Sequence, residues 1–417
     1  MTEPSTDAAP ITRIAHLARI TGVWFFVLGF VARLPFAMNI VGLLTLVTVV
    51  RGSIAEAGLV SAAFGIATGV GGPLLGAIAD RRGQRVVSVV VSVIHSALLL
   101  GIVAAVYGGS PFWLILVLTL LAGATIPPVA AYARARWIAL LADDTRRGGR
   151  GVSTALGYES MVEEITFVGG PVLVGVLATL ISPAAPVVVA AVVVLVFASA
   201  FGLHRTSSAV HPGSAHADAA VAPRRSLLAL AVLLPVAGMF FMGSFFGATL
   251  ASLTTVMEAD GLGESTGLVY GIMGATSAVA AITVGRLPAG FALHTRWVLG
   301  ATVMLIAGLV LWAAPRLPVV VVVFVFVGIA VGATLVTVFT IGARNAPGGR
   351  LSTAMAMLSS AVTIGQGITV ATVGAIAEVA GPAVFASVAV ASGGMLLVAL
   401  GATLQQRSAH PVDGGSR

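Results

Sequence analysis

The sequence predicts an all-helical integral membrane protein in which twelve transmembrane helices form two six-helix halves. The chain of 417 residues is 58% hydrophobic and only 9% charged, and its mean hydropathy of +1.07 lies far above that of soluble domains. Apolar runs long enough to cross a bilayer occur twelve times. Backbone groups in hydrocarbon must find partners within their own segment, so even the Val-rich runs are predicted to be helices.

The apolar runs fall into two sets of six. The first set lies at about 21 to 48, 58 to 79, 86 to 106, 112 to 133, 153 to 180 and 184 to 203. The second set lies at about 227 to 255, 264 to 284, 297 to 314, 318 to 341, 353 to 379 and 382 to 403. The first run is much longer than the apolar part of a signal peptide, so we expect it to remain in the mature protein.

The predicted organisation follows from these runs. Residues 1 to 20 form the cytoplasmic N-terminus, 21 to 203 the first bundle, 204 to 226 a polar, Pro-containing cytoplasmic linker, 227 to 403 the second bundle and 404 to 417 a cytoplasmic tail. The halves share short matches in corresponding runs. Gly58-Leu59-Val60 recurs as Gly267-Leu268-Val269, and Gly123-Ala124-Thr125 recurs as Gly332-Ala333-Thr334. Together the matches indicate a duplicated six-helix unit.

The distribution of Arg predicts the topology. All 22 basic residues are Arg, and all except Arg33, Arg51 and Arg316 lie at the termini or in the even-numbered loops. Positive charge marks the cytoplasmic side, so both termini are predicted to be cytoplasmic. The net charge of +7 therefore reflects topology, and we expect no nucleic-acid partner. The complete use of Arg in place of Lys suggests a GC-rich bacterial genome, and hence a bacterial inner membrane.

The stretch from Gly76 to Arg85, GAIADRRGQR, joins the second and third runs. A solvated inside loop needs Arg, but it needs neither Asp80 at the end of the run nor Gly76 four residues earlier. With Gly76, Asp80, Arg81, Gly83 and Arg85 at these spacings, the loop resembles the signature of the major facilitator superfamily of secondary transporters. The resemblance implies two pseudo-symmetric bundles around a central site and transport by alternating access.

In that family the loop is a conformational latch between the halves, so the resemblance implies the same role for these five residues. The corresponding stretch of the second half, 285 to 289, keeps Gly285 but has no Asp. We therefore expect an asymmetric latch.

The fifth run is similar to the antiporter signature of drug/proton exchangers at Gly157, Gly170, Pro171 and Gly175. Thr166 and Val174 stand where that signature has Gly. The similarity favours export over import. The alternative is a helix whose small residues and Pro serve close packing and a kink.

Three acids of the fifth run, Glu159, Glu163 and Glu164, are predicted to lie within the bilayer. Such residues usually face the bundle interior and mark proton or ion pathways. Arg33, in the middle of the first run, is the predicted partner of Glu163 or Glu164, and these four residues are our candidates for proton coupling. A purely structural salt bridge is the alternative. The Arg that proton-coupled relatives carry in the fourth span is absent from 117 to 123.

The candidates for the substrate cavity are Asn39, Phe241, Phe245 and Gln366. Phe side chains suit a greasy wall, and amides can contact a substrate. Interhelical hydrogen bonding and lipid-facing packing are the alternatives for these residues, and His95 is expected to be a hydrogen-bonded structural residue.

Three functions remain for such a chain. The first is proton-coupled efflux of a drug-like or hydrophobic compound; the second is import or export of a polar metabolite such as a sugar or amino acid. The third, a membrane enzyme or sensor, is disfavoured because no metalloprotease, nucleophile-elbow, phosphate-loop or dinucleotide motif is present. We expect a monomer in the lipid bilayer that handles a small-molecule substrate and protons, with no cofactor and no metal; lack of Cys excludes thiolate sites.

Overall fold

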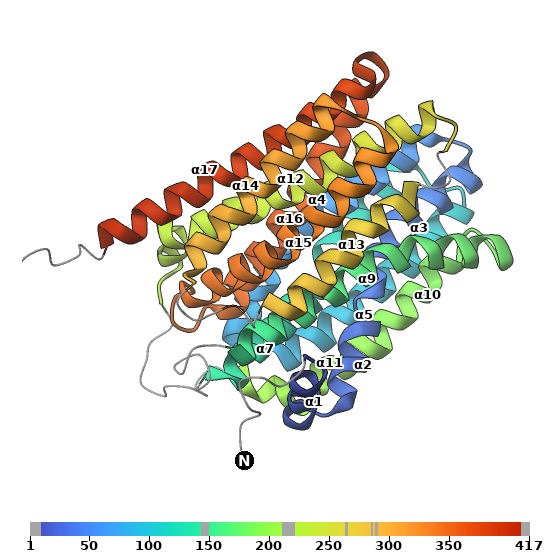
Figure 1. Cartoon of the computed structure of the whole chain (residues 1–417). Helices are drawn as coiled ribbons and strands as arrows, with labels where there is room; N and C mark the ends of the chain where they lie inside the picture. Colours follow the sequence, from blue (N-terminus) through green and yellow to red (C-terminus); the bar gives the residue numbers. More distant parts are fainter. Residues whose placement is uncertain are drawn as a thin grey trace, which may run out of the picture. The chain divides into compact units, whose positions relative to one another are not determined.

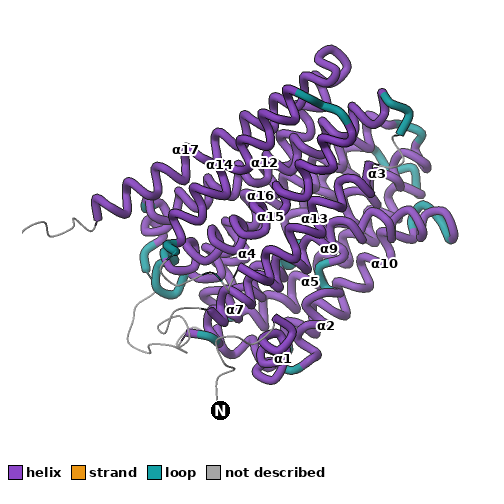
Figure 2. The backbone as a smooth tube through the Cα atoms, in the orientation of Figure 1, coloured by secondary structure: helices purple, strands orange, loops and turns teal. Residues whose placement is uncertain are grey.

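The computed structural model describes residues 10–142, 150–210, 222–262, 266–284, 287 and 291–409. Within these residues all regular structure is helical, and no strand occurs (Figure 2). The α-helices of the first half are α1 (Pro10–Thr21), α2 (Val23–Val31), α3 (Leu34–Arg51), α4 (Ile54–Arg82), α5 (Gln84–Tyr107), α6 (Phe112–Thr125), α7 (Val129–Leu140), α9 (Arg150–Leu180), α10 (Ala185–Val193) and α11 (Ser199–Leu203). Those of the second half are α12 (Leu230–Ala259), α13 (Thr266–Thr283), α14 (Leu293–Ala313), α15 (Leu317–Arg344), α16 (Leu351–Ala380) and α17 (Ala386–Ala409).

The described residues contain 11 helical segments that are long and apolar enough to cross a membrane. The twelfth, Val269–Thr283 within α13, is apolar but shorter. The predicted twelve-span, all-helical architecture is therefore confirmed. The two ends of the linker, Arg205–Val210 and Arg224–Leu228, are short 3-10 helices.

Proline interrupts the first and fourth spans, whereas a π-helical turn, Val194–Ala198, divides the sixth into α10 and α11. In the first span, α2 ends at Val31 and α3 begins at Leu34, with Pro35 in the first turn of α3. In the fourth span, Pro127 and Pro128 separate α6 from α7. Proline lacks the amide proton that would continue the helical ladder, so each span is built from two helices.

The fourth span also extends further than the sequence predicted, because α7 continues to Leu140 rather than ending near 133. Arg134 and Arg136, which the charge pattern had placed in a loop, are buried side chains of this helix. Their guanidinium groups find acceptors inside the protein, so the helix carries both charges without exposing them to lipid.

The chain folds into two compact units. The first contains Met1–Arg147, Met161–Ala222 and Gly348–Ser360, and the second contains Gly148–Ser160, Pro223–Pro347 and Ala361–Arg417. Helices α9 and α16 are each divided between the units. The first unit thus contains the start of α16, and the second contains the start of α9.

Glycines at equivalent positions of the sequence repeat make a close helix contact in each half, with partners that differ by about one helical turn. A Cβ atom added at Gly123 of α6 would lie 2.5 Å from the carbonyl oxygen of Phe64 in α4, and one added at Gly332 of α15 would lie 2.1 Å from that of Ser277 in α13. Small residues let membrane helices approach this closely. Because Gly123 and Gly332 are equivalent positions of the sequence repeat, the contacts support an internal duplication. In the second unit, α14 and α17 also run side by side (Figure 1).

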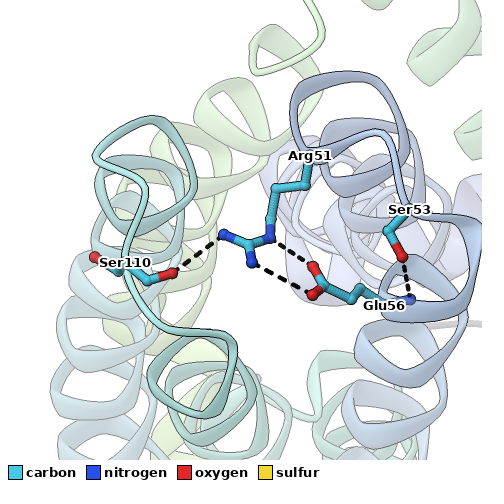
Figure 3. Close-up of polar contacts among 4 residues, drawn as sticks. All are labelled: Arg51, Ser53, Glu56 and Ser110. Carbon is cyan, nitrogen blue, oxygen red and sulfur yellow. Dashed lines mark hydrogen bonds and ion pairs between the residues drawn. The ribbon is translucent and has the colours of Figure 1, made fainter.

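An ion pair fixes the turn between α3 and α4 (Figure 3). Arg51 donates to both carboxylate oxygens of Glu56, at 2.5 and 3.3 Å, and to the carbonyl oxygen of Ser110 at 3.1 Å. The hydroxyl of Ser53 accepts a hydrogen bond from the Glu56 amide at 3.2 Å and so caps α4. These partly exposed residues join two interhelical loops at the end of α4 opposite the GAIADRRGQR stretch.

Candidate functional site

The end of α4 packs against the start of α16 through one face of small residues that ends in an acid. Gly72, Gly76 and Asp80 follow one another at four-residue intervals and therefore share a face of α4. A Cβ atom added at Gly76 would lie 2.9 Å from the carbonyl oxygen of Ser352 and 3.0 Å from the Cα atom of Thr353. The position of Gly76 thus requires a residue without a side chain for this approach.

Asp80 caps the N-terminus of α16 from another helix. One carboxylate oxygen accepts from the Ser352 amide at 3.0 Å, and the other accepts from the Thr353 amide at 2.8 Å and from its hydroxyl at 2.5 Å. The first amides of a helix have no partner within it, and the helix dipole favours a negative charge there. Since Asp80 is only 6% exposed, this contact is stronger than a surface ion pair.

The other predicted latch residues surround this contact. Gly83 adopts a φ of 85°, a conformation that favours glycine, and forms the turn between α4 and α5. Arg81 and Arg85 are exposed on either side of it. In the second half, Gly285 and most of the corresponding stretch lie outside the described residues.

Sequence reasoning missed Gln84, which lies within the same stretch. Its buried amide group donates to the Ser352 hydroxyl at 3.0 Å and accepts from Nε of Arg136 at 2.8 Å. The same Ser352 is therefore held by Asp80 through its backbone and by Gln84 through its side chain. The signal for Gln84 was its place inside the motif, but its partners come from distant parts of the sequence.

The second group of polar residues lies inside the spans. Glu163 of α9 forms an ion pair with Arg134 of α7, and Arg134 also donates to the Ser359 hydroxyl at 3.2 Å. The Arg134 side chain is fully buried, whereas 31% of the Glu163 side chain is exposed. The fourth span therefore does contain a buried Arg, nearly two helical turns after the Pro127-Pro128 break and outside the stretch in which the motif comparison looked for it.

The remaining coupling candidates are in different surroundings. Arg33 is buried at the break between α2 and α3, and Glu159 is buried in the part of α9 that belongs to the second unit. The side chain of Glu164 lies outside the described residues. The structure pairs Glu163 with Arg134, a partner that the sequence had not indicated. The pairing of Arg33 with Glu163 or Glu164 stays a prediction.

Two glycines of the antiporter-like motif make close helix contacts. A Cβ atom at Gly157 would lie 2.0 Å from the carbonyl oxygen of Ala281 in α13, and one at Gly170 would lie 2.5 Å from the Cβ atom of Ala37 in α3. Gly175 has open space beside it, and the Pro171 ring lies outside the described part of the chain. The motif residues therefore position α9 against its neighbours.

The cavity candidates differ in accessibility. Asn39 is fully buried, and its amide lies 3.2 Å from Nε2 of His95, whose Nδ1 lies 2.8 Å from the carbonyl oxygen of Ala122. Since a carbonyl only accepts, Nδ1 carries the proton and Nε2 accepts from Asn39.

In the second unit, Phe245 is buried, and the Phe241 ring packs against Gly394 of α17. Gln366 of α16 is partly exposed. No cluster of three or more potential metal ligands occurs among the described residues.

Comparison with known proteins gives the family. The family model of the Major Facilitator Superfamily matches residues 25–350, whereas no curated protein matches the sequence.

Two solved structures share the fold. The human organic anion transporter MFSD10 (TETRAN) is 17% identical, with 95% of this chain and 99% of that chain covered and a TM-score of 0.61. A bacterial homologue of the iron transporter ferroportin, in an outward-facing state with soaked iron, is 14% identical, with 92% and 98% covered and a TM-score of 0.69. At these identities the likeness concerns the fold alone. Since the family model covers more than half of the sequence, the chain belongs to the major facilitator superfamily of membrane transporters.

Proposed function

We propose that the protein is a proton-coupled exporter of a drug-like or hydrophobic compound, working by alternating access in a bacterial inner membrane as a monomer with both termini in the cytoplasm. Family membership supports transport of a small molecule. The coupling to protons is supported by one observation in particular, the pair formed by Glu163 and Arg134 inside the spans.

The ion pair has the features that a coupling site needs. A charge within the bilayer is costly unless it is compensated, and Arg134 compensates Glu163 while remaining fully buried. The Glu163 side chain is partly exposed, so the protein does not enclose it completely. Protonation of Glu163 would remove the negative charge that Arg134 binds, while the Ser359 hydroxyl would still accept a hydrogen bond from Arg134. Because a buried cation is compensated less well after this loss of charge, proton binding would favour a rearrangement of α7, α9 and α16 around Arg134.

The latch supports the alternating-access part of the proposal. Asp80 holds the start of α16 by three hydrogen bonds, and no covalent link stabilises the contact. Three hydrogen bonds are strong enough to favour one conformational state, and they can still break during each transport cycle. In this proposal it closes the cytoplasmic end of the pathway in the outward-facing state.

The proposed test is a growth-inhibition and dye-efflux panel in an efflux-deficient bacterium, followed by transport in proteoliposomes with an imposed pH gradient. The wild type should lower the accumulation of at least one compound. Glu163→Gln and Arg134→Gln should abolish transport driven by the gradient, because neither retains a pair that titrates.

Glu56→Gln is the matched control. It also removes the carboxylate of an Arg–Glu pair, but at the partly exposed turn of α4, so it should transport like the wild type. Membrane expression of each variant must be verified, because loss of one partner of a buried pair also destabilises the fold. Gradient-driven transport by Glu163→Gln at the wild-type rate would refute the coupling role. If the wild type changes neither growth inhibition nor dye accumulation for any compound, the protein is better explained as a carrier of a polar metabolite.

A further inference from the structure

His204 connects the start of the linker to the latch through a continuous chain of hydrogen bonds. His204 follows the last residue of α11 and lies just outside the sixth span. Its Nδ1 atom lies 3.0 Å from the Thr206 hydroxyl and 3.4 Å from the Thr206 amide nitrogen. The chain continues from Thr206 to Arg136, and from there to Gln84 and Ser352. All these residues belong to the first unit.

Arg136 is the central member of this chain. Its Nη1 atom donates to the carbonyl oxygen of Phe201 at 2.8 Å and to the Thr206 hydroxyl at 3.1 Å, while its Nε donates to Gln84 at 2.8 Å. The guanidinium carbon also lies 4.0 Å from the centre of the Phe201 ring. The buried guanidinium binds Phe201 and Thr206 near the start of the linker and Gln84 in α5. It therefore fixes the start of the linker relative to α5.

Arg136 also orients the amide of Gln84. A guanidinium group only donates hydrogen bonds, so the oxygen of Gln84 must face Arg136 and its NH₂ group must face Ser352. If Arg136 moved away, nothing in this chain of bonds would prevent the Gln84 amide from rotating. The hydrogen bond from Gln84 to Ser352 therefore depends on the position of Arg136.

The geometry around Thr206 sets the protonation state of His204. The Thr206 amide donates to Nδ1 of His204, so Nδ1 must carry a lone pair. The Thr206 hydroxyl accepts from Arg136 and therefore donates its own proton to the same nitrogen. Both contacts require a lone pair on Nδ1, and a doubly protonated imidazole has none. Protonation of His204 is thus incompatible with the observed bonds.

The charges around His204 act in the same direction. Arg136 approaches it from α7 and Arg205 from its own segment, while α2 contributes the Phe25 ring at 5.8 Å. Helix α5, which packs on the same 3-10 segment, carries Arg85 in its first turn. Burial, followed by the charges of Arg136 and Arg205, lowers the pKa of His204. The bonded arrangement is therefore complete above the ordinary pKa of His and is lost as the pH falls through the lowered value.

We propose that His204 is a proton-sensitive regulatory site that controls the latch, with neutral His204 holding Ser352 in place through Thr206, Arg136 and Gln84, and protonated His204 releasing it. This inference concerns the latch and is independent of the substrate and of the Glu163–Arg134 pair. His204 lies at the end of the protein that carries the Arg-rich loops. Acidification on that side would weaken the contact between α4 and α16.

The test uses the absence of native Cys. Spin labels on Arg82→Cys and Gly348→Cys, two exposed positions in the first unit, report the distance between the end of α4 and the start of α16 by pulsed electron spin resonance in nanodiscs. In the wild type, the ratio of long to short distances should rise about tenfold as the pH falls from about 8 to below the lowered pKa of His204.

His204→Asn keeps an acceptor oxygen near the position of Nδ1 and cannot become charged, so its distance distribution should stay short and independent of pH. His16→Asn, in α1, is the control, and its distance distribution should change with pH as in the wild type. His204→Lys should show the long distance at every pH. The proposal is overturned if the wild-type distance does not change with pH, or if His204→Asn retains the wild-type pH response. An Asp80→Asn variant that keeps the short distance at every pH would also overturn it, because the contact at Ser352 would then not hold the helices together.

Discussion

Replacement of Asp80 by Asn should shift the conformational equilibrium of the protein toward the state in which α4 and α16 are apart. The substitution removes the negative charge at the N-terminus of α16 and leaves one acceptor oxygen where the carboxylate has two. Three hydrogen bonds converge on the carboxylate. A hydrogen bond to a charged group contributes a net of about 1.5–3 kcal/mol, and a charge at a partly buried helix end contributes up to about 2 kcal/mol.

The amides of Ser352 and Thr353 are hydrated when the contact opens, so only part of this sum is lost. We expect a loss of about 2–3 kcal/mol, which is a change of about 30- to 140-fold in the ratio of the two states. The measurement is the distance distribution between spin labels on Arg82→Cys and Gly348→Cys in nanodiscs. Asp80→Asn should convert a predominantly short distance into a predominantly long one. Glu56→Gln, at the opposite end of α4, should leave the distribution unchanged.

The reasoning would be refuted by an unchanged distribution in a well-folded Asp80→Asn protein. In that case the three hydrogen bonds would stabilise neither state over the other. A drop in thermal stability without a change in distance would assign Asp80 a role in folding only.

Two further predictions concern packing. Gly76→Ala should lengthen the same distance, because its added methyl carbon would lie 2.9 Å from the Ser352 carbonyl oxygen, whereas Gly65→Ala in the same helix meets nothing within 4 Å and should behave like the wild type; equal distances in both variants would contradict the close contact. Asn39→Leu should lower the midpoint of thermal unfolding in detergent, since a lost partner for a buried polar group costs about 1–3 kcal/mol. Adding His95→Leu should restore part of that loss, and a double variant less stable than Asn39→Leu would contradict the pairing.

The number and helical nature of the spans could be predicted because each is set by a local property, a run of apolar residues of membrane length. The breaks in the first and fourth spans also have a local cause, since Pro35 and the Pro127-Pro128 pair act on their own helix. What failed was the end of the fourth span. The rule that assigns Arg to water-exposed loops takes no account of acceptors inside the protein, and Arg134 and Arg136 both have such acceptors.

The partners of the functional residues could not be predicted for a related reason. The motif identified Asp80 but not the amides it binds, which are more than 250 positions away. The position of Glu163 within the fifth run indicated that it needs a basic partner, and Arg33, in the middle of the first run, was the basic residue that the sequence placed within the bilayer. Depth along a helix says how far a side chain is from the surface, but it does not say which way the helix is turned. In the structure Glu163 pairs with Arg134.

The sequence distance between Asp80 and its partner has a consequence for biosynthesis. Ser352 follows Asp80 by 272 residues, so at about 5–20 residues per second the ribosome needs roughly 15 to 55 s to deliver the amides that the carboxylate binds. During this interval eight spans are made while Asp80 waits for its partners. The contact is therefore among the last to form on a nascent chain. A truncated chain that ends before α16 would lack the amides that bind Asp80. Its carboxylate would remain without this contact, and membrane quality-control proteases would act on the chain in that state.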